Sequence, residues 1–373
     1  MALFGQLLSA AGKSSQASLN ESQKPSPGMP IIIAKRCVRA RHIASTCTAC
    51  VDACPVDAMR LIDKHVKLHV PNCTLCGACA AVCPVDALYV AKPGGDALDK
   101  AFAEAKQSGT LAVRCEMAAR EEAPQSGASL RVPCLSGLDF SRLADAAAGG
   151  LTALTLTAGD CARCPRANPK EPVAETAGNL QSFFESAGAG TAVTLKRAPR
   201  TVDMSRRRLF GGFLRKSGAD AQAAPAPDSA FARIADEPEK RLPDSRRRFI
   251  DAMKTFAAGS PDAPAAADGL LMTVAGKADA CSMCGICEMV CPTEAIKTVR
   301  EVEGFRVSCV RAHCVGCGLC ADICFPHALS LAPLTGIAAA LDEKPETILF
   351  KKTASVHNSE TDGSAVHVPV YRT

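Results

Sequence analysis

The chain has 373 residues, of which 21 are cysteine and only 4% are aromatic, and it contains no tryptophan. A conventional core built on large aromatic rings is therefore not expected over most of its length. The formal net charge of +5 counts every thiol as neutral, so this mild basicity does not indicate a nucleic-acid partner, and a continuous basic stripe with stacking aromatics is missing.

The first 30 residues are expected to form an extended N-terminal tail. Residues 1–11 have no positive charge ahead of their apolar residues and no small-residue cleavage site, which is not typical of a signal peptide. No stretch reaches the roughly eighteen consecutive apolar residues of a membrane span. Cysteines hold metal in reducing compartments, so we expect a cytoplasmic protein whose thiols are metal ligands.

Four cysteine motifs follow, two in residues 31–95 and two in residues 269–335. The spacing C-x2-C-x2-C-x3-C occurs three times, at Cys73, Cys76, Cys79 and Cys83, at Cys281, Cys284, Cys287 and Cys291, and at Cys314, Cys317, Cys320 and Cys324. The first motif along the chain keeps Cys47, Cys50 and Cys54. There Ala44 stands in the place of the leading cysteine, and Cys37 is the obvious substitute.

This spacing suits iron–sulfur chemistry. Two-residue gaps let a tight loop wrap one face of a cubane, and the fourth cysteine ligates the other cluster of a pair. Three of the motifs end in Cys-Pro, and an acid follows at Asp57, Asp86 and Glu294. Proline suits the first position of a helix and an acid suits the first turn, so we predict a helix after each Cys-Pro.

The repeated motifs resemble the bacterial-type 2[4Fe-4S] ferredoxin family, present twice, as in a polyferredoxin-like electron-transfer protein. The resemblance implies four [4Fe-4S] clusters with cross-paired ligands. The implied ligand sets are group I (Cys54, Cys73, Cys76, Cys79), group II (Cys37, Cys47, Cys50, Cys83), group III (Cys291, Cys314, Cys317, Cys320) and group IV (Cys281, Cys284, Cys287, Cys324). The alternative for group II, where the insertion after Cys37 departs from the family pattern, is a [3Fe-4S] cluster.

Zinc is the competing metal, because it also takes four thiolates from C-x2-C pairs. Three cysteines in a C-x2-C-x2-C run that leads to Cys-Pro favour iron–sulfur clusters instead. One cysteine, Cys309, is left over near the last motif. We interpret it as a buried thiol, with ligand exchange as the alternative.

Between the two ferredoxin-like segments, residues 96–200 alternate between helix and strand signals. The periodicity predicts helices at 96–109, 139–148 and 179–186, and strands at 111–115, 130–132, 151–157 and 191–195. Such alternation predicts a small open α/β sheet. The fold class is therefore α+β, with two ferredoxin-like domains flanking an α/β domain, an extended linker and extended tails.

Four further cysteines, the central group (Cys115, Cys134, Cys161, Cys164), each follow a predicted strand. Because the carboxyl ends of parallel strands share one edge, their thiols could converge there. Residues 131–139 and 158–164 resemble the delta subunit of methyl-viologen-reducing hydrogenases, which implies a fifth centre, a [2Fe-2S] cluster. A [4Fe-4S] cluster, zinc and scattered buried thiols are the alternatives.

Residues 201–268 are expected to be a linker rich in alanine and proline, and residues 336–373 a C-terminal tail. The linker repeats the sequence SRRRLF at 205–210 as SRRRFI at 245–250, and each serine could cap a basic helix with an apolar face. These helices either dock a partner or pack on their own ferredoxin domains. The segment is also similar to the cytoplasmic accessory ferredoxins of periplasmic nitrate reductases.

No residue pattern supplies a nucleophile with its base, so we expect an electron-transfer subunit and not a catalyst. It would relay single electrons between a donor and a larger cytoplasmic oxidoreductase complex containing flavin or molybdenum. The alternative is an accessory or maturation ferredoxin that docks on a molybdenum-type reductase. Neither nucleic acid nor a transmembrane segment is expected.

Overall fold

The structure is a computed structural model that describes residues 29–90, 95–118, 127–164, 166, 173–198, 238–260, 271–335, 341 and 343–352. The expected tail at 1–28, the first SRRR repeat at 205–210 and residues 353–373 lie outside the described residues. Within the described ranges, no helix has the length and apolar character needed to cross a membrane.

The first ferredoxin-like segment, residues 30–90, is called the first ferredoxin half, and it is built from two small antiparallel sheets. Strand β1 (Pro30–Ile32) pairs with β4 (Leu88–Val90), and β2 (Met59–Ile62) pairs with β3 (His65–Leu68). Between them lie the short helices α2 (Val38–Arg41), α3 (Ala49–Asp52) and α4 (Ala78–Ala81) and the 3-10 turn η1 (Val70–Asn72). Its apolar core is small, and cysteines make up much of what packs against it.

The second half repeats this plan and adds a strand. Strand β9 (Met272–Gly276) pairs with β12 (Leu329–Pro333), while β10 (Ile296–Arg300), β11 (Gly304–Cys309) and β13 (Glu346–Lys352) form a three-stranded antiparallel sheet. Helices α11 (Ile286–Val290) and α12 (Leu319–Asp322) and the turn η5 (Arg311–His313) complete it. Strand β13 lies in the segment that we expected to be an extended tail, and its Leu349 is buried in the core of this half.

The helices predicted after Cys-Pro do not form, and that prediction was wrong. A tight turn replaces each of the three, with positive φ at the third residue after the cysteine: Asp57 (50°), Asp86 (47°) and Glu294 (56°). His327 (53°) holds the same position after Cys324, where Phe325 stands before the proline. In the first half, this turn directs an amide back to the sulfur. The N–H of Ala58 donates to Cys54 Sγ at 3.1 Å, and the N–H of Ala87 donates to Cys83 Sγ at 3.2 Å. A helix would direct the same amide to a carbonyl instead.

A four-stranded parallel sheet follows in the chain. Its strands are β5 (Thr110–Cys115), β6 (Ala128–Val132), β7 (Ala153–Ala158) and β8 (Ala192–Arg197), in the order β6-β5-β7-β8. Helix α5 (Gly95–Ser108) leads into β5, α6 (Phe140–Ala148) connects β6 to β7, and α7 (Val173–Ser186) connects β7 to β8. The 3-10 turns η2 (Leu135–Gly137) and η3 (Cys161–Arg163) follow β6 and β7. The core is aliphatic and aromatic, and it is the largest apolar cluster in the described part of the chain.

Helix α10 (Asp244–Gly259) carries the second SRRR repeat and packs along α6 of the sheet region. Its apolar face is buried, with Met253 at 0% exposure, and Phe249 and Phe256 join an aromatic cluster with Phe183. Ser245 does not cap the helix as predicted, since Pro243 is the N-cap residue. The apolar face of this helix packs on the sheet region of the same chain, and not on a ferredoxin domain as the second alternative for the repeat had it.

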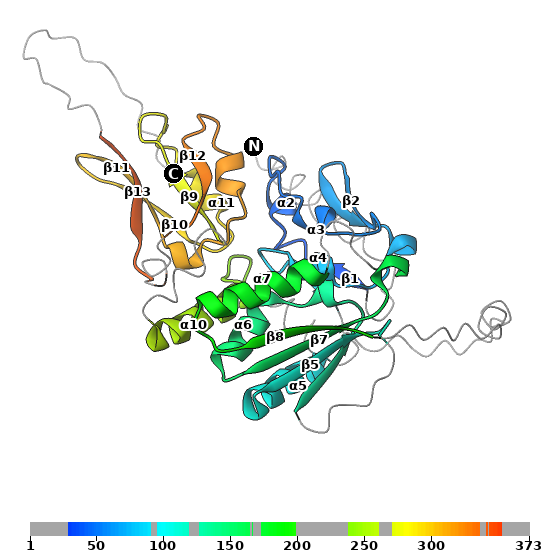
Figure 1. The fold of residues 1–373 in the computed structure, drawn as a ribbon. Helices are drawn as coiled ribbons and strands as arrows, with labels where there is room; N and C mark the ends of the chain where they lie inside the picture. Colours follow the sequence, from blue (N-terminus) through cyan, green and yellow to red (C-terminus); the bar gives the residue numbers. More distant parts are fainter. Residues whose placement is uncertain are drawn as a thin grey trace, which may run out of the picture.

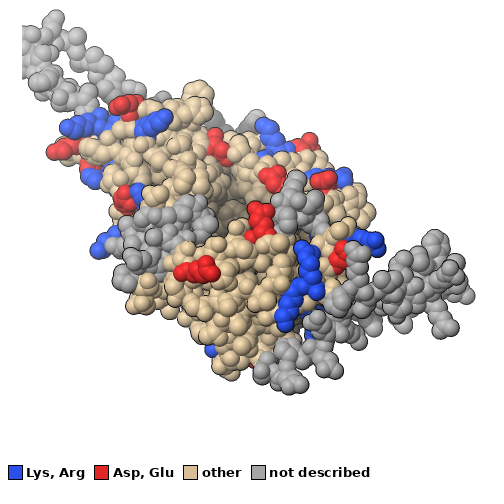
Figure 2. All heavy atoms as spheres, in the orientation of Figure 1, with Lys and Arg blue, Asp and Glu red and all other residues tan. Residues whose placement is uncertain are grey.

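The two ferredoxin halves lie beside each other on one side of the parallel sheet (Figure 1). The sheet region separates them in sequence but not in space. The N–H and hydroxyl of Thr46 both donate to the carboxylate of Asp322, at 2.7 and 2.9 Å. On the face that Figure 2 shows, acidic and basic side chains are scattered, and neither sign forms a continuous stripe.

Candidate iron–sulfur sites

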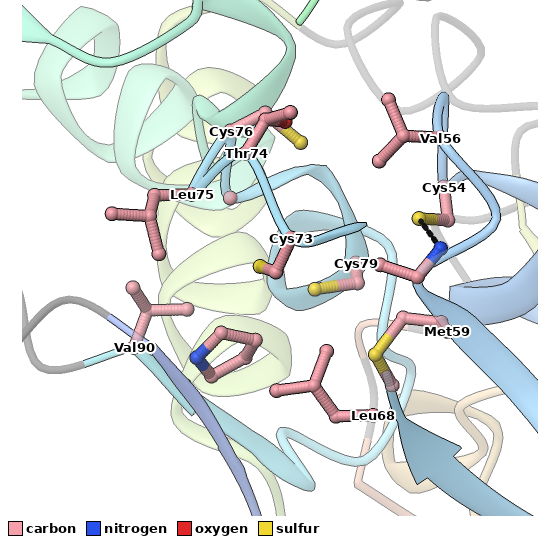
Figure 3. Close-up of a pocket in the computed structure, with 13 residues that line it drawn as sticks. Cys54, Val56, Met59, Leu68, Cys73, Thr74, Leu75, Cys76, Cys79 and Val90 are labelled. Carbon is pink, nitrogen blue, oxygen red and sulfur yellow. Dashed lines mark hydrogen bonds between the residues drawn. The ribbon is translucent and has the colours of Figure 1, made fainter. Parts of the chain in front are cut away.

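Group I lines a hollow in the first ferredoxin half. All four of its cysteines line the space, and the remaining wall is largely apolar (Figure 3): Pro30, Val56, Ala58, Met59, Leu68, Thr74, Leu75, Gly77 and Val90. Cys73, Cys76 and Cys79 come from one loop, and Cys54 comes from the turn that precedes β2. The four thiols of group I therefore lie around one hollow.

The loop that carries these thiols depends on two left-handed residues. Leu75, between Cys73 and Cys76, has φ 59°, and Gly77 has φ 84°. The same pattern recurs with Met283 (58°) and Gly285 (76°), and again with Gly316 (63°) and Gly318 (77°). Positive φ at these positions lets the chain turn tightly between successive cysteines.

Group II brings Cys37 together with the other three cysteines that the resemblance implied. Cys37 is the N-cap residue of α2, so the insertion folds into this helix before the chain returns to Cys47. Burial raises the pKa of the Cys50 thiol to about 12, and the other three thiols of group II add to this rise. Arg39, which is buried, donates to the carbonyl oxygen of Cys47 and so holds the loop that leads from α2 to Cys47.

Group III is the most enclosed of the sets in the second half. Burial raises the pKa of the Cys317 thiol to about 12, and Cys291 and Cys314 contribute further. The leftover thiol of Cys309 is 0% exposed and shares a hydrogen bond with the Cys314 thiol. That bond raises the pKa of Cys309 and lowers the pKa of Cys314, so Cys309 is the donor.

Group IV lies at the surface. Cys281, Cys287 and Cys324 pack against the core of the second half, while Cys284 is exposed. Burial raises the pKa of the Cys287 thiol to about 11, and Cys284 and Cys281 add to the rise. In contrast, a hydrogen bond from the backbone N–H of Ile286 lowers the pKa of the Cys284 thiol. One ligand position of group IV is therefore open to solvent.

The central group gathers at the carboxyl edge of the parallel sheet. Cys115 ends β5, Cys134 follows β6, and Cys161 and Cys164 follow β7 on either end of η3. Burial raises the pKa of the Cys161 thiol, and the other three thiols of the group contribute, whereas Arg197 opposes them. The N–H of Gly159 donates to Cys115 Sγ at 3.2 Å. The sheet thus places the four side chains near one another.

The thiols fit iron–sulfur clusters by their chemistry. All 21 cysteines are free of disulfide bonds. Buried thiols with pKa values of 11 to 12 stay protonated in the metal-free chain, and a cationic iron core supplies the charge that lets them ionise. Zinc requires its donors to meet at about 2.3 Å from one ion. In the described part of the chain, no three Cys, His, Asp or Glu side chains are arranged to hold a single metal ion.

Comparison with protein families gives two matches. Residues 31–88 match the 4Fe-4S dicluster domain, and residues 277–297 match the 4Fe-4S binding domain. The chain carries two 4Fe-4S domains of the ferredoxin type. They indicate an iron–sulfur electron-transfer role, as the sequence predicted.

Neither the curated proteins nor the solved structures contain a significant match to this chain. The comparisons do not support the resemblance of residues 131–139 and 158–164 to the hydrogenase delta subunit, nor the wider polyferredoxin assignment. The 4Fe-4S domains are consistent with an electron carrier and do not by themselves identify its partner.

Several residues around these sites were not predicted from the sequence. Thr46 and Asp322 join the two ferredoxin halves, and Ser245, Arg246 and Arg248 anchor α10 to three different parts of the molecule. The repeated SRRR sequence was a signal for the last three, but their partners are far away along the chain. Nothing local to Thr46 distinguishes it from any other polar loop residue.

Proposed function

We propose that the chain relays single electrons through four [4Fe-4S] clusters held by groups I to IV, as a subunit or partner of a larger oxidoreductase with a flavin or molybdenum centre. The observation that carries the proposal is the adjacency of the groups within each half. Cys50 of group II is among the neighbours that raise the pKa of Cys79 in group I. Cys287 of group IV has the same effect on the pKa of Cys320 in group III.

A [4Fe-4S] cluster supplies one-electron chemistry when bound. The chain's own contribution is to hold the thiolates and to set the stability of their negative charge. Backbone amides donate to sulfur at Cys54, Cys83 and Cys281, at 3.1, 3.2 and 3.4 Å. Such donors stabilise the more negative state, while burial opposes it, so each group has its own balance of the two.

We extend the proposal to a fifth centre at the central group. Its support is the convergence of four thiols at the carboxyl edge of a parallel sheet, where ligand sites of open α/β sheets assemble. Arg166 helps to close this edge, because its guanidinium donates to Glu116 and to the carbonyl oxygen of Pro133. A [2Fe-2S] cluster is the centre that we favour there.

The alternative of an accessory ferredoxin that docks through its SRRR helices has less support. The apolar face of α10 is occupied by α6 and by the aromatic cluster around Phe183. A partner could bind that face only if α10 left the sheet region. We therefore do not base a docking function on this helix.

Iron and acid-labile sulfide analysis of the anaerobically purified chain tests the proposal. Four cubanes require about sixteen irons per chain, and a central [2Fe-2S] cluster would raise this to about eighteen. Cys309→Ala is the matched control, since it removes a cysteine that belongs to no group and should leave the iron content unchanged. An iron content below about eight per chain contradicts the two-ferredoxin assignment.

A further inference from the structure

The path between the two ferredoxin halves begins where two candidate ligands share one apolar cluster. They are Cys47 of group II and Cys317 of group III, which are 270 residues apart in the chain. Both side chains pack against one apolar cluster, in which Val38, Val85 and Ala87 of the first half meet Leu319 of the second. Leu319 is 0% exposed, so solvent does not separate the two groups there.

A second contact joins the first half to the parallel sheet. Cys134 of the central group is the N-cap residue of η2, and η2 packs against α4, next to Cys76 of group I. The backbones touch beside these thiols, because a Cβ on Gly137 would lie 2.4 Å from the carbonyl oxygen of Cys76. Group I and the central group therefore face each other across a close backbone contact.

The SRRR repeat of α10 holds these three parts in place. Ser245 Oγ donates to Asp86 of the first half at 2.7 Å, and Arg246 Nε donates to the carbonyl oxygen of Ala312 in the second half at 2.8 Å. Arg248 donates to Asp139 at the start of α6, also at 2.8 Å. Three residues within one run of four, Ser245, Arg246 and Arg248, thus contact both ferredoxin halves and the sheet region.

We infer that the cysteine groups form one ordered path: central group, group I, group II, group III and group IV. The inference rests on the proposed function and adds the order in which the groups pass the electron. The electron crosses between the halves at Cys47 and Cys317, and Cys284 is the solvent-exposed end of the path. Each electron that a low-potential carrier protein gives to one end leaves from the other end to a one-electron acceptor. Every group gains and loses one electron, and no bond or proton is exchanged at its thiolates.

The crossing can be tested at the Thr46–Asp322 contact, because Thr46 is exposed and belongs to no cysteine group. Thr46→Asp places two carboxylates against each other and should open the junction. Thr46→Asp with Asp322→Lys restores an attractive pair. The matched control is Thr48→Asp, which adds the same charge in the same loop but beside Asp52, its hydrogen-bond partner at 2.6 Å within the first half.

The readout is the magnetic interaction between reduced centres, measured by electron paramagnetic resonance of the full chain at equal iron content. In the unmodified protein we expect splitting that links the two halves. Thr46→Asp should lose this splitting, and electrons should equilibrate between its halves more slowly. The variant with Thr46→Asp and Asp322→Lys should regain the splitting and the faster equilibration. Thr48→Asp should resemble the unmodified protein. An Asp322→Ala variant, which removes the acceptor of both hydrogen bonds without adding a charge, should shift both readouts in the same direction.

Two results would overturn the ordered path. One is an unmodified chain whose signals show no interaction beyond that within each half. The other is a Thr46→Asp variant that keeps both the splitting and the equilibration rate. A failure of the proposed function looks different, because it would appear as a low iron content in the unmodified chain before any variant is compared.

Discussion

Arg246 lies 8% exposed beneath η5, where its Nε donates to the carbonyl oxygen of Ala312 at 2.8 Å. A second donation runs from its terminal nitrogen to the carbonyl oxygen of Arg311 at 3.2 Å. The two bonds fix one planar guanidinium across the turn that leads into Cys314. A side chain from the segment expected to be a linker therefore positions a ligand loop of the second ferredoxin half.

Arg246→Lys should destabilise this turn. Lysine keeps the charge but cannot donate to both carbonyls in one plane, and a lost charged hydrogen bond at a buried site costs about 2 kcal/mol. The measurement is the thermal midpoint for loss of the visible cluster absorption under anaerobic conditions. Arg247→Lys is the control, because in the part of the chain that the structure describes the Arg247 side chain pairs only with the neighbouring Asp244, at 3.1 Å, and is largely exposed. Equal midpoints for the two variants would contradict the role of Arg246.

Gly137→Ala should disturb the contact between the sheet region and group I. The new Cβ would meet the carbonyl oxygen of Cys76 at 2.4 Å, and this neighbour is backbone that cannot rotate away. We expect a lower thermal midpoint and an altered resonance signal from group I. Gly178→Ala is the matched control, since nothing lies within 4 Å of its Cβ in α7, and it should stabilise the helix by up to about 1 kcal/mol. Unchanged signals in Gly137→Ala would show that the contact is loose.

Cys309→Ala should lower the reduction potential of one cluster without removing iron. The Cys309 thiol donates to the Cys314 thiol, and a hydrogen bond to a ligand sulfur stabilises the more negative reduced state. A potentiometric titration of the full chain measures the shift. Loss of about four irons in the variant would instead make Cys309 a ligand.

Phe249→Ala should weaken the attachment of α10. The Phe249 ring lies 5.9 Å from the ring centre of Phe140 and 6.3 Å from that of Phe183. Truncating a buried phenylalanine costs about 3 to 5 kcal/mol, whereas Phe249→Leu keeps most of the volume and should cost about 1 kcal/mol. Hydrogen exchange of the α10 amides measures the effect. Equal protection in both variants would mean that this ring does not hold the helix.

Removal of iron should unfold the ferredoxin halves before the parallel sheet. The buried set of the first half centres on Met59, Cys79 and Leu88, so much of its folding free energy must come from metal binding. The sheet has a large core that includes Leu111, Leu154 and Phe184. Hydrogen exchange after oxidative iron release should therefore show lost protection in β1 to β4 and retained protection in β5 to β8. The opposite order would contradict this view.

The cysteine spacing predicted the two 4Fe-4S domains because ligand geometry constrains short segments of chain. The strands of the parallel sheet also lie close to the predicted segments, since buried apolar residues recur at alternate positions, at Leu111 and Val113 of β5 and at Leu154 and Leu156 of β7. The turns after Cys-Pro were mispredicted because proline and an acid suit a helix start equally well. The third residue of each turn has a positive φ, and in the first half the turn directs a backbone N–H to the cysteine sulfur. Local helix propensity does not predict this conformation.

Other features depend on contacts between distant parts of the chain. The expected linker contains α10, whose polar residues find partners in three regions, and the expected tail contains β13, which pairs with β11. Thr46 and Asp322 meet only because the halves are placed side by side. No pattern within either segment predicts these partners, since each pairing is decided by tertiary packing.

The most direct test of the account is a reductive titration of the intact chain, with spin quantitation by electron paramagnetic resonance and iron analysis of the same sample. Four clusters in groups I to IV predict about sixteen irons and uptake of about four electrons, with any central [2Fe-2S] cluster adding about one. The account would be contradicted by a chain that binds zinc in place of iron, or by one that accepts about two electrons or fewer at full metal occupancy.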